Sequence, residues 1–172
     1  MVSPEFVDEK LARLGIEPLF GEYAPLSLDE VGELERRLGA FPPAYREVVM
    51  KYGGAVFNRE VCFRPVDPRI LVIAPDGLLT LDCIYGAAQG NDPWDPNSLR
   101  ANIEWTNGRM PSTMIPVAGS GSDYVCLGLS APDRGRVFYW ERESEPTVNY
   151  NNVYLIAQSF GEFLGQLKCS ND

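Results

Sequence analysis

Three carboxylates in the second half of the chain are the side chains best suited to acid–base chemistry: Asp123, Glu141 and Glu143. Paired carboxylates hydrolyse glycosides when one of them has a raised pKa and the other acts as nucleophile or base. The sequence around them indicates neither a raised pKa nor a nucleophile with a partner, and no sugar-binding cleft. Hydrolysis by these groups therefore has little support.

Histidine is absent from the whole chain. Its absence removes the usual general base near neutral pH, the usual member of Ser or Cys triads and the commonest metal ligand. The four cysteines are scattered without a Cys-x-x-Cys pair, so neither a zinc knuckle nor a redox motif is supported: Cys62, Cys83, Cys126 and Cys169. No Asp-x-Asp-x-Asp-Gly calcium loop occurs either. We expect a protein that is not an enzyme and has no metal site and no cofactor.

Residues 91–96 have the residue types of a protein-binding loop. Trp94 stands there between Asp92 and Asp95. Tryptophan is favoured at interface hot spots, where one side chain can contribute about 2 kcal/mol or more, and flanking carboxylates suit a basic partner. The alternative is that Trp94 folds back over the protein's own sheet.

A second candidate surface lies at a predicted strand end. Glu141, Glu143 and Glu145 alternate there, so their side chains share one face. Three carboxylates on one face repel one another unless a cation meets them. Ordinary solvated edge charges, which also discourage aggregation of sheets, explain the same pattern.

Charge and composition restrict the class of partner. The 172 residues fit one domain, residues 1–172, and the 45% hydrophobic content argues against disorder. A net charge of −9 repels phosphate backbones and anionic lipids. We therefore expect no nucleic acid and no membrane among the partners, and a basic protein is the natural complement. The same charge also serves simply to keep a cytoplasmic protein soluble.

Neither a signal peptide nor a membrane span is expected. The first 20 residues carry the acidic Glu5, Asp8, Glu9 and Glu17 where a signal peptide needs a basic end and an apolar stretch. The longest apolar run, residues 70–74, is far shorter than the ~20 residues that cross a bilayer. We expect a cytoplasmic protein with reduced cysteines.

Three helices are predicted at the N-terminal side, over residues 4–14, 27–39 and 42–53. Ser27 and Glu30 have the spacing of a capping box at the start of the second. Its apolar stripe is Leu28, Val31, Leu34 and Leu38, and Glu33 and Arg37 can pair at i, i+4. Gly53-Gly54 ends the third helix and turns the chain into a strand. A phosphate cradle is the poorer interpretation, because no strand precedes the glycines and no Lys-Ser or Lys-Thr follows.

Strands dominate from residue 60 onward. Residues 70–74 and 79–85 are expected to pair as a hairpin around Pro75-Asp76-Gly77. A weak helix is predicted over residues 97–105 and a closing helix over 159–167, with strands at residues 114–118, 124–129, 136–141 and 154–157. This order predicts an α+β fold with a mainly antiparallel twisted sheet, the N-terminal helices and the C-terminal helix packing around it.

Several short sequence motifs follow one another along the chain. They are Leu-Glu-x-x-Leu-Gly at residues 34–39, Pro-x-x-Tyr-Arg at 42–46, Tyr-Gly-Gly at 52–54, Ile-Pro-Val-Ala at 115–118, Asp-Tyr-Val-Cys-Leu at 123–127, Gly-Arg-Val-Phe-Tyr-Trp at 135–140, and the closing segment 156–164. The ordered set resembles the SUKH superfamily, the Smi/Knr group of cell-wall regulators and bacterial toxin-immunity proteins. Where many relatives have Trp-Asp-His-Glu, this chain has Trp-Glu-Arg-Glu at residues 140–143. The resemblance implies the fold and a protein-binding habit rather than particular contact residues.

Resemblance, charge and the lack of a catalytic constellation together predict an immunity protein. It would bind a cognate, basic toxin domain in the cytoplasm, as a monomer or weak homodimer, and block the toxin's active site. The expected toxin-facing residues are the two candidate sets: Asp92, Trp94 and Asp95, with Glu141, Glu143 and Glu145. The alternative is a regulatory or scaffold module of the cell-wall-regulator kind with no toxin partner.

Overall fold

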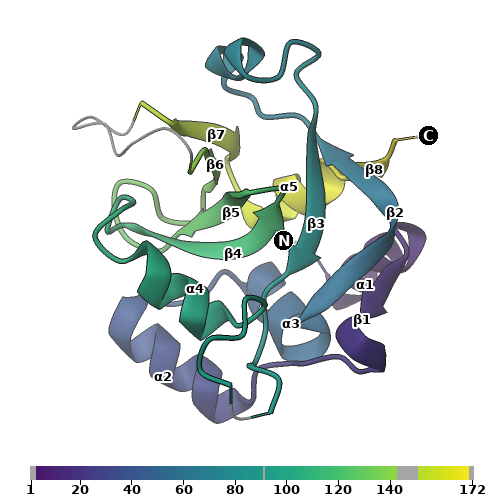
Figure 1. The fold of residues 1–172 in the computed structure, drawn as a ribbon, viewed down its shortest axis with the longest axis vertical. Coiled ribbons are helices and arrows are strands. Elements are labelled where there is room, and N and C mark those ends of the chain that lie inside the picture. The colour runs from purple at the N-terminus through teal and green to yellow at the C-terminus, as the bar shows by residue number, and fades with distance from the viewer. Residues whose placement is uncertain (1–2, 91, 143–150, 171–172) are drawn as a thin grey trace.

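A computed structural model describes residues 3–90, 92–142 and 151–170 of the chain (Figure 1). Its strands form one sheet in the order β1-β2-β3-β4-β5-β6-β7, with β8 paired to β2, and every pair is antiparallel. The helices are α1 Pro4–Arg13, α2 Leu28–Leu38, α3 Pro43–Tyr52, α4 Leu99–Thr106 and α5 Phe160–Gln166, with short 3₁₀ helices η1 Leu19–Gly21 and η2 Pro68–Val72. The strands are β1 Ile16–Pro18, β2 Ala55–Phe63, β3 Leu79–Ile84, β4 Met114–Ser120, β5 Asp123–Gly128, β6 Val137–Trp140, β7 Val153–Ala157 and β8 Lys168–Cys169. The predicted α+β class is confirmed. Among these described helices, none is long and apolar enough to cross a membrane.

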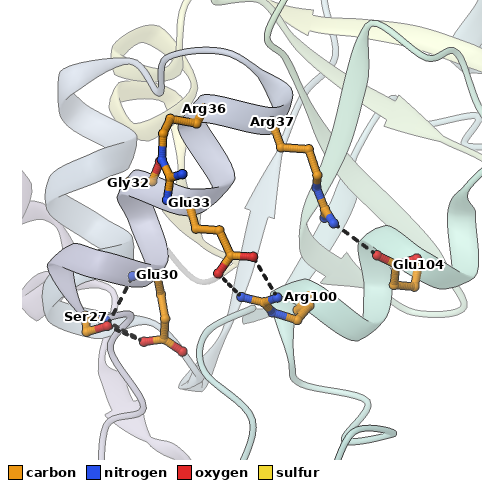
Figure 2. A network of polar contacts seen from close by, with 8 residues as sticks. All are labelled: Ser27, Glu30, Gly32, Glu33, Arg36, Arg37, Arg100 and Glu104. Atoms are coloured by element: carbon orange, nitrogen blue, oxygen red, sulfur yellow. Dashed lines mark hydrogen bonds and ion pairs between the residues drawn. The ribbon is translucent and has the colours of Figure 1, made fainter.

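Helix α2 begins where the capping pattern predicts. The Ser27 hydroxyl accepts the backbone N–H of Glu30, and the Glu30 carboxylate accepts the backbone N–H of Ser27 at 2.8 Å. The ion pair expected within the helix does not form. Glu33 instead pairs with Arg100 of α4 at 3.0 Å, and Arg37 pairs with Glu104 at 3.4 Å (Figure 2). Because α4 lies alongside α2, Glu33 and Arg37 form ion pairs with residues of α4 and not with each other.

The predicted hairpin between residues 70–74 and 79–85 is wrong. Residues 68–72 form η2, and β3 pairs with β2 from Phe63↔Leu79 to Ala55↔Ile84. Pro68 presets the first turn, and the Asp67 carboxylate accepts the backbone N–H of Arg69 at 3.0 Å. Both favour a helical turn over a strand. Strands β1 and β8, with three and two residues, are too short to leave a periodic signal.

The core lies between the sheet and the helices α1, α3 and α5. Tyr45 of α3 is completely buried, and its ring packs edge-on against Phe41 and Phe160, each at a centroid distance of 5.1 Å. Phe63 of β2 meets Phe163 of α5 in the same way at 5.7 Å. These contacts join elements from both ends of the chain, so the sheet and its helices form one continuous core.

Three chain segments cross at a point that only glycine permits. The backbone N–H of Ala24 donates to Gly53 O at 2.7 Å, and that of Ala87 donates to Ala24 O at 2.8 Å. A Cβ on Gly86 would lie 2.2 Å from both Ala24 O and Gly54 N, far inside van der Waals contact. Gly54 also has a positive φ of 70°. The double glycine thus ends α3, as predicted, and lets residues 86–98 lie against residues 22–26. We call Ala24, Gly53, Gly54 and Gly86 the glycine crossing.

Arg69 ties η2 to the outer edge of β7. Its guanidinium Nη2 donates to Asp67 Oδ2 at 2.5 Å and to Val153 O at 2.7 Å, and the group lies over the Tyr154 ring at 5.2 Å. Beside it, the backbone N–H of Asp67 donates to Leu155 O at 3.1 Å. These bonds occupy carbonyls of an edge strand that would otherwise be open to pairing with another chain.

Substituting Arg69→Ala is expected to lower the free energy of unfolding by about 1–2 kcal/mol, because it removes charge-assisted hydrogen bonds to partly buried acceptors. The hydrogen bond from Arg69 lowers the pKa of Asp67. The stability it contributes is therefore present above the ordinary pKa of 3.8 and is lost as pH falls below it. Urea unfolding of both proteins, at neutral pH and below 3.8, measures this. Equal differences between the proteins at the two pH values would contradict it.

Candidate functional site

Trp94 is exposed at the tip of the loop that follows β3. Two thirds of its side-chain surface, 67%, is open, so the alternative in which it folds back over the sheet is wrong. The neighbouring Asp92 is also exposed, and its carboxylate accepts the backbone N–H of Trp94 at 2.9 Å. This local turn holds the indole outward. The structure therefore presents an aromatic side chain and a carboxylate together, as predicted.

Asp95 has a different place from the one we expected. It is only 6% exposed, and its carboxylate accepts the backbone N–H of Gln89 at 2.7 Å and that of Asn97 at 2.9 Å. The expectation that its side chain faces outward with Asp92 is wrong. The reason is local chemistry, because a short carboxylate can satisfy the backbone N–H groups of a tight loop. Asp95 shapes the loop that carries Trp94.

The predicted acidic strand end is only partly within the described residues. Glu141 follows β6 and is half-buried, and it receives a hydrogen bond from the Tyr154 hydroxyl at 3.4 Å. Glu143 and Glu145 lie outside the described residues. Figure 1 shows the end of β6 and the loop of residues 86–98 at opposite ends of the molecule. The described part of the predicted acidic surface, Glu141 after β6, therefore lies away from that loop.

Among the described side chains that could take part in catalysis, Asp123 is hydrogen-bonded and the buried thiols of Cys83 and Cys126 are protonated. The Asp123 carboxylate accepts hydrogen bonds from the Tyr139 hydroxyl and from the backbone N–H of Arg142 at 2.7 Å. Burial raises the pKa of Cys83 to about 11 and also raises that of Cys126. Both thiols are therefore protonated near neutral pH and poor nucleophiles. Within the described ranges, no three His, Cys, Asp or Glu side chains are grouped to hold a metal ion.

Sequence reasoning missed the exposed apolar side chains of residues 19–28. Phe20 is 82% exposed and has a left-handed backbone, with φ 52°, which is uncommon for a bulky residue. Leu28, which we assigned to the buried stripe of α2, is 61% exposed because the first turn of the helix extends past the core. Tyr23 is also exposed. No periodic pattern marks Phe20 or Tyr23, and the helical pattern that includes Leu28 predicts burial, so only the left-handed tolerance of neighbouring Gly21 indicates an irregular turn.

Figure 1 shows the chain before α2 and the loop of residues 86–98 running through the same end of the molecule. The glycine crossing holds residues 22–26 against the start of the loop, and a small crevice there is lined by Leu26, Glu30, Ala87 and Arg100 among others. We call the surface formed by the exposed side chains of both segments the acidic aromatic end: Phe20, Glu22, Tyr23, Leu28, Asp29, Asp92 and Trp94.

Basic residues are absent from both segments. Residues 14–35 and 70–99 contain no Lys or Arg, while the first stretch alone has the acidic residues Glu17, Glu22, Asp29, Glu30, Glu33 and Glu35. Arg100, which lines the crevice, is engaged by Glu33 in a two-pronged ion pair (Figure 2). The side-chain hydrogen bonds from Arg100 lower the pKa of Glu33. Because residues 14–35 and 70–99 contain acidic residues and no Lys or Arg, the net charge of these two segments is negative.

A pocket of about 460 Å³ lies on the other flank of α2, between its last turn, α4 and β4. Its lining mixes apolar side chains, including Leu38, Met110 and Met114, with the ion pair between Arg37 and Glu104. Those two charges already neutralise each other. The pocket therefore offers volume without an unpaired charge directed at a ligand.

Three comparisons place this chain among known proteins. The sequence model of the SMI1 / KNR4 family (SUKH-1) matches residues 25–166. The comparison with curated proteins gave no match. A similar solved structure, described as that of a protein from Pseudomonas syringae pv. tomato, has 18% sequence identity and a TM-score of 0.49, over 80% of this chain and 83% of that one. Because the family model spans well over half of the sequence, this chain belongs to the SMI1 / KNR4 family (SUKH-1).

Proposed function

We propose that this protein is a non-catalytic immunity protein, which binds a basic toxin domain and blocks its active site. The observation that carries the proposal is the exposed indole of Trp94, which stands beside Asp92 within residues 70–99, a stretch without Lys or Arg. An exposed aromatic side chain beside carboxylates suits recognition of a cationic protein surface. The family match is consistent with a binding domain of this kind.

Binding is favoured over catalysis by the chemistry of the side chains. The chain contains no histidine, and Cys83 and Cys126 are kept protonated by burial. The Asp123 carboxylate is used in two hydrogen bonds that fix the end of β5 against β6. These three groups therefore already serve the fold, which leaves none of them as an activated nucleophile or base.

A toxin that acts on nucleic acid would have a basic groove, and the net charge of −9 suits such a partner. Opposite charges steer the two proteins toward each other and raise association rates to about 10⁸–10⁹ M⁻¹s⁻¹ at low salt. Fast capture is what an inhibitor needs in a cell that makes or receives a toxin.

The family match fits a second candidate equally: a regulatory or scaffold module with no toxin partner. The two proposals differ in the number and strength of partners. An immunity protein has one tight partner, whereas a scaffold has several weak ones.

Affinity purification of the tagged full-length protein from its native cells distinguishes them. We expect one dominant, basic partner in equimolar amount, and co-expression with this protein should relieve the toxicity of that partner in a test host. Several weak partners would favour the scaffold. A toxic partner whose toxicity persists on co-expression would contradict the immunity proposal.

Trp94→Ala should weaken binding of the purified partner about tenfold or more, because the indole supplies a large apolar contact at low entropic cost. The unfolding temperature should stay unchanged, since the side chain is mostly solvated. Titration calorimetry and thermal unfolding measure the two quantities. The matched control is Val72→Ala, an exposed apolar side chain in η2, which should bind normally. Equal affinities for all three proteins would exclude Trp94 from the interface.

A further inference from the structure

We infer that the acidic aromatic end is the docking surface, and that its occupant is a basic protein segment carrying apolar side chains that cover Trp94 and Leu28. The inference rests on the proposed function, since it assigns the place and chemistry of that binding. It differs from the sequence-based expectation in two ways. It adds residues of the first 30, and it leaves out Asp95 and the strand end at Glu141.

The two halves of this surface are held together before any partner arrives. The glycine crossing joins them through the backbone bond from Ala87 N to Ala24 O at 2.8 Å. The ion pairs from Arg100 to Glu33 and from Arg37 to Glu104 join α2 to α4, the helix that follows the loop in sequence (Figure 2). A surface that needs little ordering loses less entropy on binding. Segments far apart in sequence therefore act as one platform.

Apolar side chains are concentrated on this platform. Trp94 is 67% exposed, Leu28 61% and Phe20 82%, and Tyr23 is open at its edge. Single exposed apolar residues are ordinary on protein surfaces, but several at one end, rimmed by charges, are typical of interaction sites. The left-handed backbone of Phe20 adds to this, because strain in a bulky residue tends to persist where function requires the geometry.

The charge of the acidic aromatic end determines what kind of protein segment can bind there. Glu22, Asp29 and Asp92 are exposed here, and the adjoining residues 14–35 and 70–99 have no Lys or Arg. The positive end of the α2 dipole is offset by Asp29 and Glu30 in its first turn. A second copy of this chain would bring the same carboxylates face to face, which is repulsive. A cationic segment is the complement.

The structure offers an internal control for this assignment. Val66, Leu71 and Val72 are also exposed apolar side chains. They belong to the connection between β2 and β3, which Figure 1 draws at the opposite end of the molecule from the loop of residues 86–98. Arg64 and Arg69 lie in that connection, so its charge is different. A purely hydrophobic ligand would use either group, whereas a basic one should prefer the acidic aromatic end.

A synthetic amphipathic peptide of alternating leucine and lysine clusters is a suitable probe, because it needs no toxin. We expect binding at low salt with a Kd of about micromolar order, weakened about tenfold or more at high salt. Binding should shift the emission of Trp94 to the blue, and Trp94→Phe identifies this signal among the three tryptophans. A peptide with glutamate in place of lysine should not bind.

Variants locate the peptide on the surface. The double substitution Glu22→Gln, Asp29→Asn should flatten the salt dependence, and Leu28→Ala should weaken binding about fivefold or more. Val72→Ala and Glu141→Gln serve as matched controls and should bind like the wild type. Circular dichroism checks that each variant keeps its helices. Binding that is lost with Val72→Ala, or unaffected by the Glu22, Asp29 and Leu28 changes, would overturn the inference.

The purified toxin partner separates this inference from the proposed function. If the protein neutralises a toxin whose affinity is unchanged in the Glu22→Gln, Asp29→Asn and Leu28→Ala proteins, the docking surface is wrong and the immunity function stands. If the peptide binds with the expected pattern and no toxin is neutralised, the surface is supported and the immunity function is wrong.

Discussion

Gly86→Ala should lower the free energy of unfolding by about 3 kcal/mol or more, at or above the upper range for overpacking a core. The new methyl group would lie 2.2 Å from Ala24 O and 2.2 Å from Gly54 N. Both are backbone atoms held in hydrogen-bonded segments, so neither can move as a flexible side chain would. Relief requires the crossing to open, which breaks the bond from Ala87 N to Ala24 O. Chemical denaturation measures the loss.

Gly32→Ala is the matched control. Gly32 lies inside α2, and a Cβ there meets nothing within 4 Å. Alanine is the better helix former, so this variant should gain about 0.5–1 kcal/mol. If the free energy of unfolding of Gly86→Ala were within about 1 kcal/mol of the wild-type value, the segments at the glycine crossing would be able to move apart at little cost. Such a small loss lies below the usual range for overpacking a core. It would also weaken the view that residues 86–98 are rigidly held.

Removing the Tyr45 ring should have an effect of similar size. Tyr45 has no exposed surface and packs edge-on against Phe41 and Phe160. Tyr45→Ala should therefore cost about 3–5 kcal/mol, as for other buried aromatic rings. Its hydroxyl has no hydrogen-bond partner among the described residues. Tyr45→Phe should then be neutral or stabilising by up to about 1 kcal/mol, because it removes a buried polar atom without breaking a bond.

Alkaline pH tests the same site in another way. Burial raises the pKa of Tyr45 well above its ordinary value of 10.0. Below pH 10 the folded and unfolded states are equally protonated there, so stability is fully present. Above pH 10 only the unfolded state ionises, and stability falls by about 1.4 kcal/mol per pH unit for each such tyrosine. Tyr45→Phe should decline less steeply than the wild type, and identical slopes would contradict the burial of this hydroxyl.

Local features of this fold could be predicted because they depend on neighbours in the chain. The capping box of Ser27 and Glu30 involves residues three apart, and the turn at Gly53-Gly54 depends on backbone freedom alone. The positions of strands β4 to β7 were predicted from apolar patterns over short windows, and the structure confirms them. The apolar run of residues 70–74 led us to predict a strand, but Pro68 favours the first turn of a helix, and the segment forms η2.

The candidate site was predictable only in part for the same reason. The residue types around Trp94 were visible in the sequence, but the side-chain directions were not, since Asp92 faces solvent and Asp95 is buried only three residues later. The exposure of Leu28 was missed because helical spacing shows only which residues share a face of the helix. It does not say how far the helix extends past its core.

The sequence by itself determined the absence of histidine chemistry, the negative charge, the helix starts, the antiparallel class of the sheet and the family to which the chain belongs. Tertiary structure alone decided that residues 20–30 and residues 92–94 share one end, and that the strand end at Glu141 lies elsewhere. It also decided that Arg100 neutralises Glu33. The physical reason is that each of these depends on contacts between segments tens of residues apart, which no local pattern encodes. The glycine crossing, which holds residues 22–26 against the start of the loop, is one such contact.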